Sequence, residues 1–127
     1  MSPYVLDTSV VLAVLFVEKG HETAGRLAKG ASMSSVNVAE VVTKCIEFAY
    51  PEDQAIEYIV DTNITIVGFD LELATLTAML RKRSFKGVLS LGDRACIATA
   101  IRQGCTAVTA DRIWSALDLG CPVELIR

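Results

Sequence analysis

Apolar positions recur along the chain with two spacings, one typical of strands and the other of helices. Short, mostly β-branched runs predict strands over Tyr4–Leu6, Ser32–Ser34, Ile64–Val67, Thr106–Thr109 and Val123–Ile126. Longer stretches predict helices over Ser9–Val17, His21–Lys29, Ser35–Ala49, Pro51–Val60, Asp70–Arg83, Leu91–Arg102 and Trp114–Leu117. Because each helix must return the chain before the next parallel strand can pair, this alternation predicts an α/β fold. We expect a central, mainly parallel sheet of four or five strands, flanked by helices on both faces.

Length and composition indicate one folded domain over residues 1–127. The chain is 52% apolar and 21% charged, which excludes a disordered, collagen-like or low-complexity protein. The longest apolar run, Val10–Val17, is much shorter than the roughly 20 residues of a membrane-spanning helix. The N-terminus lacks the basic segment of a signal peptide. We therefore expect a cytoplasmic protein that makes no membrane contact.

Three aspartates occupy positions where a parallel sheet binds ligands. Asp7 directly follows the first predicted strand, and Asp111 lies two residues past Thr109. Ligands of such sheets bind beyond the carboxyl ends of the strands. Asp93 falls on the apolar stripe of the Leu91–Arg102 helix, where an unpaired carboxylate is costly to bury. A cluster of this kind should bind a divalent cation or have raised pKa values, and oxygen ligands favour Mg²⁺ or Mn²⁺ over zinc.

Each of these aspartates also has a structural interpretation. Asp7 is placed to cap the helix that begins near Ser9, and Asp111 is placed to cap the Trp114 helix. The Ser90–Asp93 segment fits a capping box, in which the Asp93 side chain bonds to the Ser90 amide. Convergence of the three carboxylates at one edge of the sheet is what favours a shared site.

Basic residues are concentrated in the last third of the chain. Residues 1–80 carry a net charge of −7 and residues 81–127 carry +4. The basic residues that could attract a polyanion are Arg81, Lys82, Arg83, Lys86, Arg94 and Arg112. Taken alone, the pattern is explained better by a solvated helix end, because cations in a last turn complement the helix dipole.

Four segments together resemble, in order along the chain, the motifs of PIN-domain ribonucleases: Val5–Ser9, Ser35–Val41, Leu89–Cys96 and Val108–Asp111. Within this family they look most like the VapC-type toxins of bacterial type II toxin–antitoxin pairs. The resemblance covers essentially the whole chain, and the four acidic positions do not depart from it. It implies a PIN-like fold and an endoribonuclease that depends on Mg²⁺ or Mn²⁺.

The resemblance also implies an acidic catalytic pocket formed by Asp7, Glu40, Asp93 and Asp111. Asp7 and Asp93 would be direct metal ligands, and Glu40 and Asp111 would bind the metal directly or through water. The hydroxyls of Ser9 and Thr109 would orient the carboxylates.

Only the resemblance assigns Glu40. The apolar stripe of its helix includes Val38, Val41 and Cys45, which leaves Glu40 on the opposite face beside Lys44 at position i+4. From the residues alone, an ion pair between Glu40 and Lys44 is the simpler expectation.

In such a nuclease the metal activates a water for attack on the phosphodiester, so products would carry a 5′-phosphate and a 3′-hydroxyl. The six basic residues named above would then contact RNA. Toxins of this kind form homodimers and are silenced by a cognate VapB-type antitoxin, whose tail can place a basic side chain in the acidic pocket. The Val10–Val17 run could belong to either interface or to the core, and the core is the default expectation.

Three other functions remain to be compared with this one. A PIN-domain nuclease of RNA processing or decay would use the same residues. A phosphoaspartate phosphohydrolase needs Asp-x-Asp after the first strand and a later lysine, whereas this chain has Ser9 at the third position and no lysine beyond Lys86. A non-catalytic binding module would have no need of the intact acidic set.

Overall fold

The computed structural model describes residues 2–83 and 87–127, and in these ranges the strands form one five-stranded sheet. The strands are β1 (Tyr4–Leu6), β2 (Ser32–Ser34), β3 (Thr65–Val67), β4 (Thr106–Thr109) and β5 (Val123–Leu125). Their order is β3-β2-β1-β4-β5, and each neighbouring pair is parallel. The predicted parallel sheet is confirmed.

The helices lie close to their predicted positions. They are α1 (Thr8–Leu15), α2 (His21–Ala28), α3 (Ser35–Glu47), α4 (Glu52–Asp61), α5 (Leu71–Met79) and α6 (Leu91–Gln103), with short 3₁₀ helices η1 (Leu80–Lys82) and η2 (Arg112–Ala116). Three predicted helices, α1, α3 and α5, end at least two residues early, and α3 stops at Glu47, before Ala49 takes a positive φ of 56°. Helix α1 stops at Leu15, before Val17 takes a positive φ of 53°, and α5 tightens into η1 instead of continuing to Arg83.

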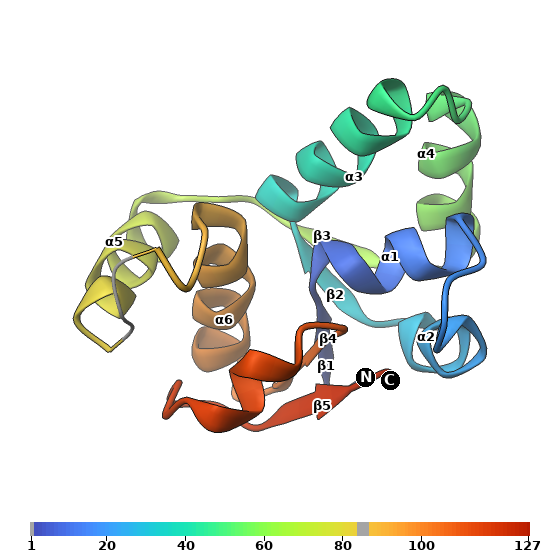
Figure 1. The fold of residues 1–127 in the computed structure, drawn as a ribbon. Helices are drawn as coiled ribbons and strands as arrows, with labels where there is room; N and C mark the ends of the chain where they lie inside the picture. The colour runs from blue at the N-terminus through green and yellow to red at the C-terminus, as the bar shows by residue number, and fades with distance from the viewer. Residues whose placement is uncertain (1, 84–86) are drawn as a thin grey trace.

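Successive strand residues face opposite sides of the sheet and so enter two different cores. Leu6 and Val108 pack with side chains from α1 to α4, whereas Val5 and Ala107 pack with side chains from α5, α6 and η2. Figure 1 shows the same division, with α5 and α6 on one side of the sheet and α1 to α4 on the other. Helices therefore cover both faces, as predicted.

The register of the sheet brings distant parts of the chain to one edge. Leu6, the last residue of β1, pairs with Val108 of β4, so Asp7 and Thr109 follow side by side. Strand β2 pairs with β1 on its other side, and α3 begins directly after β2. Because all these strands are parallel, the residues that follow them share the carboxyl edge, where a ligand site is expected.

Helices long and apolar enough to cross a membrane do not occur among the described residues. All four cysteines are free, and Cys45 and Cys96 are fully buried as small apolar side chains.

Candidate active site

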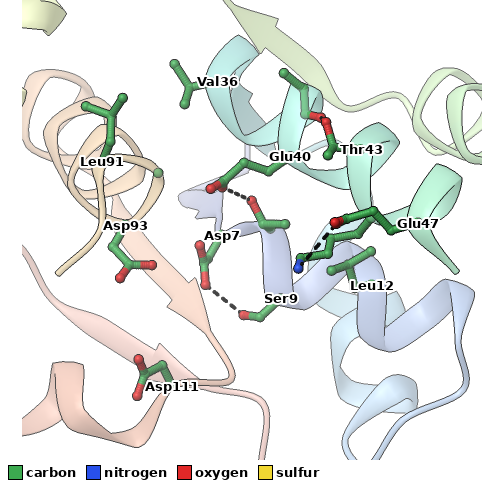
Figure 2. Close-up of a pocket in the computed structure, with 14 residues that line it drawn as sticks. Asp7, Ser9, Leu12, Val36, Glu40, Thr43, Glu47, Leu91, Asp93 and Asp111 are labelled. Atoms are coloured by element: carbon green, nitrogen blue, oxygen red, sulfur yellow. Dashed lines mark hydrogen bonds and ion pairs between the residues drawn. The ribbon is translucent and has the colours of Figure 1, made fainter. Parts of the chain in front are cut away.

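A pocket of about 740 Å³ opens at the carboxyl edge of the sheet. The four predicted acids, Asp7, Glu40, Asp93 and Asp111, all line it (Figure 2). Each comes from a different part of the fold, respectively the end of β1, helix α3, the first turn of α6 and the segment after β4. The structure thus brings together side chains that are up to about 100 residues apart in the sequence.

Asp7 is the most buried of the four acids, with only 5% of its surface exposed. Its Oδ2 atom accepts hydrogen bonds from Ser9 Oγ at 2.7 Å and from Thr109 Oγ1 at 2.9 Å. Although Asp7 is the residue before α1, its side chain makes no capping hydrogen bond, so the capping interpretation is wrong for this residue. The carboxylate is oriented by hydroxyls and belongs to the pocket.

Burial raises the pKa of Asp7 from 3.8 to about 6. The hydrogen bond from Ser9 opposes this shift, and the nearby negative charge of Asp93 adds to it. A buried carboxylate beside a second carboxylate is destabilised when both are charged. This corner of the pocket therefore favours a proton or a cation.

Ser9 and Thr109 connect the acids at the ends of β1 and β4. Besides binding Asp7, Ser9 Oγ accepts the Ala110 amide at 2.9 Å, and Thr109 Oγ1 accepts the Asp111 amide at 3.0 Å. The two hydroxyls therefore fix both the Asp7 carboxylate and the backbone that carries Asp111.

Asp93 and Asp111 have capping contacts as well as a place in the pocket. The Ser90–Asp93 capping box is present, with the Ser90 amide donating to Asp93 Oδ2 at 2.9 Å. Burial raises the pKa of Asp93, the Ser90 hydrogen bonds lower it, and the charges of Asp111 and Glu40 raise it further. Asp111 Oδ1 accepts the Ile113 amide at 3.1 Å and so caps η2. For these two residues the structural and the functional interpretations hold together.

Glu40 points into the pocket and does not pair with Lys44. Its Oε1 accepts hydrogen bonds from Thr8 Oγ1 at 2.6 Å and Asn37 Nδ2 at 3.2 Å, while Lys44 Nζ lies 3.5 Å from Glu47 Oε1. The ion pair expected from the residues alone is therefore replaced by contacts to α1 and to the first turn of α3.

Three residues around Glu40 were not identified from the sequence: Thr8, Asn37 and Gly92. A Cβ atom on Gly92 would overlap the Glu40 carboxylate, so the first turn of α6 makes room for it. Asn37 and Gly92 carry a signal in the sequence, because asparagine and glycine are poor helix formers and both stand at predicted helix positions.

The family model for the PIN domain matches residues 4–119. The chain belongs to the PIN domain family. This confirms the resemblance of the four motifs, and the fold is that of the family. No curated protein matches the sequence.

Solved structures share this PIN fold over nearly the whole chain. A chain from a toxin–antitoxin complex of Klebsiella pneumoniae aligns with a TM-score of 0.76 and 15% identity, covering 98% of this chain and 98% of its own. VapC20 of Mycobacterium tuberculosis, a toxin that cleaves the sarcin–ricin loop, aligns with a TM-score of 0.75 and 20% identity over 89% and 93%. A chain of DNA-bound VapBC from Salmonella typhimurium aligns with a TM-score of 0.74 and 18% identity over the full length of both.

The basic residues of this PIN domain are distributed differently from the expectation. Arg94 is buried, and its Nη1 donates to the Thr77 carbonyl at 3.0 Å in the contact between α6 and α5. This corrects the expectation that Arg94 contacts RNA, because the covering helix leaves it too little exposed surface. Lys86 lies outside the described residues.

The remaining predicted cations are exposed but do not line the acidic pocket. Arg81, Lys82 and Arg83 lie in and directly after η1, and Arg112 Nη1 donates to the Arg127 carbonyl at 2.9 Å. Among the described residues, Lys44 is the one basic side chain that lines the pocket. The helix spacing predicts Lys44 only as an ion-pair partner for Glu40.

The pocket of the PIN domain fits a divalent metal by its chemistry. Its donors are carboxylate oxygens, the ligands preferred by Mg²⁺ and Mn²⁺, and Asp7 is buried without a basic partner among its hydrogen bonds. The carboxylates stand apart, however, and in residues 2–83 and 87–127 no three acidic, histidine or cysteine side chains are grouped closely enough to hold an ion as they stand. The types of donor atom therefore suit a divalent metal. The carboxylates would have to move closer together to coordinate the same ion.

Proposed function

We propose that this PIN domain is a divalent-metal-dependent endoribonuclease and the toxin of a type II toxin–antitoxin pair. The observation that carries the proposal is that four carboxylates line one pocket. Asp7 is buried beside two hydroxyl groups, and the negative charge of Asp93 raises its pKa. Membership of the PIN family and the likeness to toxin structures support it.

In this proposal, Asp7 and Asp93 bind the metal, and Glu40 and Asp111 complete the acidic pocket. A bound Mg²⁺ or Mn²⁺ would activate water and neutralise charge on the phosphate. Ser9 and Thr109 hold Asp7 in one orientation, so its free energy of reorganisation on binding is small. No protein nucleophile is needed, and the products carry a 5′-phosphate and a 3′-hydroxyl.

RNA approaches an acidic pocket in this mechanism, so cations must attract its phosphates. Lys44 is exposed on the wall of the pocket and is the nearest candidate. We propose that Arg81, Lys82, Arg83, Lys86 and Arg112 contribute further along the strand of RNA.

The partners that we propose are a VapB-type antitoxin and a second copy of the chain, in the cytoplasm. Support comes from similar structures, since the Klebsiella and Salmonella chains were solved in toxin–antitoxin assemblies. A nuclease of RNA processing or decay would share the chemistry, and its distinguishing property would be the lack of toxicity and of an antitoxin.

A cleavage assay with matched variants tests the catalytic part of the proposal. We expect the wild-type protein to cut RNA with Mg²⁺, to stop in EDTA and to recover when Mg²⁺ is restored. Asp7→Asn should lose at least roughly 100-fold in rate, because a buried ligand is removed. Asp53→Asn is the control, because Asp53 is exposed in the first turn of α4 and does not line the pocket. Equal cutting by wild type and Asp7→Asn, or cutting unaffected by EDTA, would show that the proposal is wrong.

Expression in a bacterial host tests the toxin part. We expect wild-type expression to arrest growth and Asp7→Asn expression to be tolerated at equal protein level. Co-expression of the product of an adjacent small gene should restore growth with the wild type. Active nuclease without growth arrest would favour RNA processing or decay.

A further inference from the structure

The side-chain amide of Asn37 joins three helices around Glu40, and Asn37 itself does not line the pocket. Asn37 is fully buried in the first turn of α3. Its Nδ2 atom lies 3.1 Å from Thr8 Oγ1 of α1, 3.2 Å from Glu40 Oε1 of α3 and 3.0 Å from the Gly92 carbonyl of α6. The two N–H groups of this amide therefore face three acceptor oxygens, one from each of the three helices around Glu40, and at least one N–H is shared between two of them.

The direction of these hydrogen bonds requires a donor at position 37. The Gly92 carbonyl and the Glu40 carboxylate can only accept hydrogen bonds. The Thr8 hydroxyl donates a hydrogen bond to Glu40 at 2.6 Å, so its oxygen can accept one from residue 37. An aspartate here would bring a second negative charge to the Glu40 carboxylate. The amide is therefore the group that suits this junction.

Within the described part of the chain, only one end of the Asn37 side-chain amide is hydrogen-bonded. Its Oδ1 atom is buried with no partner, which is costly for an amide oxygen. A residue needed only to bridge α3 and α6 would not have to approach Glu40. The hydrogen bonds that the side chain makes with described residues all come from its NH₂ group, which is consistent with a role as a donor to Glu40 and its neighbours.

The arrangement restrains a side chain that is otherwise flexible. Glu40 is held by Thr8 and Asn37 on one oxygen, and it occupies the space that a Cβ atom on Gly92 would fill. Loss of the Asn37 donor would leave Thr8 as its one remaining hydrogen-bond partner among the described residues. Partners that orient a metal-binding carboxylate contribute to metal affinity even though they do not touch the ion.

We propose that Asn37 is a positioning residue, which fixes the Glu40 carboxylate in the pocket and so sets the affinity of the site for a divalent ion. This inference rests on the proposed metal-dependent function of the pocket. Asn37 acts through Glu40 and does not itself bind metal or RNA.

Mn²⁺ binding, measured by electron paramagnetic resonance or calorimetry without RNA, tests the inference. Asn37→Ala should weaken Mn²⁺ binding by roughly 10- to 100-fold. In a Glu40→Gln background the same substitution should have no further effect, because the residue acts through Glu40. Thr99→Ala is the control: Thr99 is fully buried and bonds the Ala95 carbonyl at 2.8 Å within α6, away from the pocket. Its Mn²⁺ affinity should equal that of wild type.

Unchanged Mn²⁺ affinity in Asn37→Ala, or an equal loss in the wild-type and Glu40→Gln backgrounds, would overturn the inference. A measurement on folded wild type covers the case in which Asn37→Ala does not fold. The Asn37 NH₂ signals in a ¹⁵N–¹H spectrum should shift when Mg²⁺ is added, and Glu40→Gln should abolish that shift. Asn37 NH₂ signals that do not shift on addition of Mg²⁺ would likewise overturn the inference.

The outcomes separate this inference from the function on which it rests. Wild type that binds Mn²⁺ tightly and cuts no RNA would end the nuclease proposal and leave Asn37 with its role. If the wild type cuts RNA and Asn37→Ala binds Mn²⁺ as tightly as the wild type does, only the inference about Asn37 is wrong. Wild type that binds no Mn²⁺ would end both.

Discussion

Gly92 and Glu40 occupy complementary space, because a Cβ atom on residue 92 would overlap both carboxylate oxygens of Glu40. A glycine inside a helix costs about 1 kcal/mol relative to alanine. Gly92 is the second residue of α6, so the fold accepts this cost where the glutamate enters the pocket.

Gly92→Ala should therefore improve the helix and damage the site. We expect cleavage or Mn²⁺ affinity to fall by at least roughly tenfold, because Glu40 must leave Thr8 and Asn37. Gly25→Ala is the matched control: Gly25 lies within α2, and a Cβ atom there meets nothing within 4 Å. That variant should keep full activity and gain roughly 0.5–1 kcal/mol in free energy of unfolding. Full activity in Gly92→Ala would show that the contact does not matter.

The raised pKa of Asp7 makes stability depend on pH in a defined direction. Its pKa is 3.8 in the unfolded chain and about 6 in the folded protein, so between these pH values the folded state binds more protons. The free energy of unfolding should therefore fall as pH rises from about 4 to about 6, and the loss should stay constant above that. Over this interval it amounts to about 3 kcal/mol.

Asp7→Asn removes this loss. In EDTA at pH 7, urea unfolding should show the variant to be more stable than wild type by up to about 3 kcal/mol, with little difference at pH 4. Asp70→Asn provides a contrast, because the Leu73 amide and then Arg102 lower the pKa of Asp70. Asp70 stabilises the fold above its unfolded pKa, so its removal should destabilise the protein at pH 7. Asp7→Asn that is less stable than wild type at pH 7 would contradict the assigned burial cost.

Metal binding should stabilise the folded protein. A ligand at about 100 times its dissociation constant adds about 2.7 kcal/mol, which corresponds to roughly 10 °C in Tm for a domain of this size. We expect this shift when Mg²⁺ or Mn²⁺ is added to wild type, and the same shift with the control variant Asp53→Asn. Thermal unfolding of Asp7→Asn should show little or no shift. A full shift in Asp7→Asn would place the bound ion elsewhere.

Lys44 should contribute to RNA binding and little to stability. Its ion pair with Glu47 joins two half-exposed side chains at 3.5 Å, and such pairs contribute about 0–1 kcal/mol. Lys44→Ala should raise KM several-fold at nearly constant kcat, and reduce the slope of log affinity against log salt concentration by about 1. Lys29→Ala is the comparison, because Lys29 lines a different hollow beside α2. Equal effects from the two lysines would indicate a general charge effect.

The sequence predicted most of the fold because a helix begins within a few residues of the end of β1, β2, β3 and β4. The carboxyl ends of parallel strands then lie at one edge of the sheet, where a ligand binds. Asp7 and Asp111 could be placed from this rule alone. The place of Glu40 could not be predicted in this way. The apolar stripe of its helix shows which side packs against the sheet, but hydrogen bonds from Thr8 and Asn37 determine where its carboxylate points. Those contacts depend on how α1, α3 and α6 pack together, and the sequence of one helix alone does not reveal this packing.

Arg94 shows a second limit of helix periodicity. A one-sided stripe predicts that the residue beside Asp93 is exposed, but α6 is covered by the sheet on one side and by α5 on another. Residues from Arg94 to Ala100 are consecutively buried as a result. The second covering helix is a property of the tertiary structure, and it turned an expected surface cation into an interior one.

Strand β1 lies in the middle of the sheet although it is made first, and its neighbour β4 is made about 100 residues later. A nascent chain that still lacks β4 holds Asp7 without Thr109 and without Asp111. Fragments released early in translation would have the same defect. The order of synthesis thus delays assembly of the acidic centre until β4 and the residues after it have emerged from the ribosome, so a shorter nascent chain holds only part of the pocket.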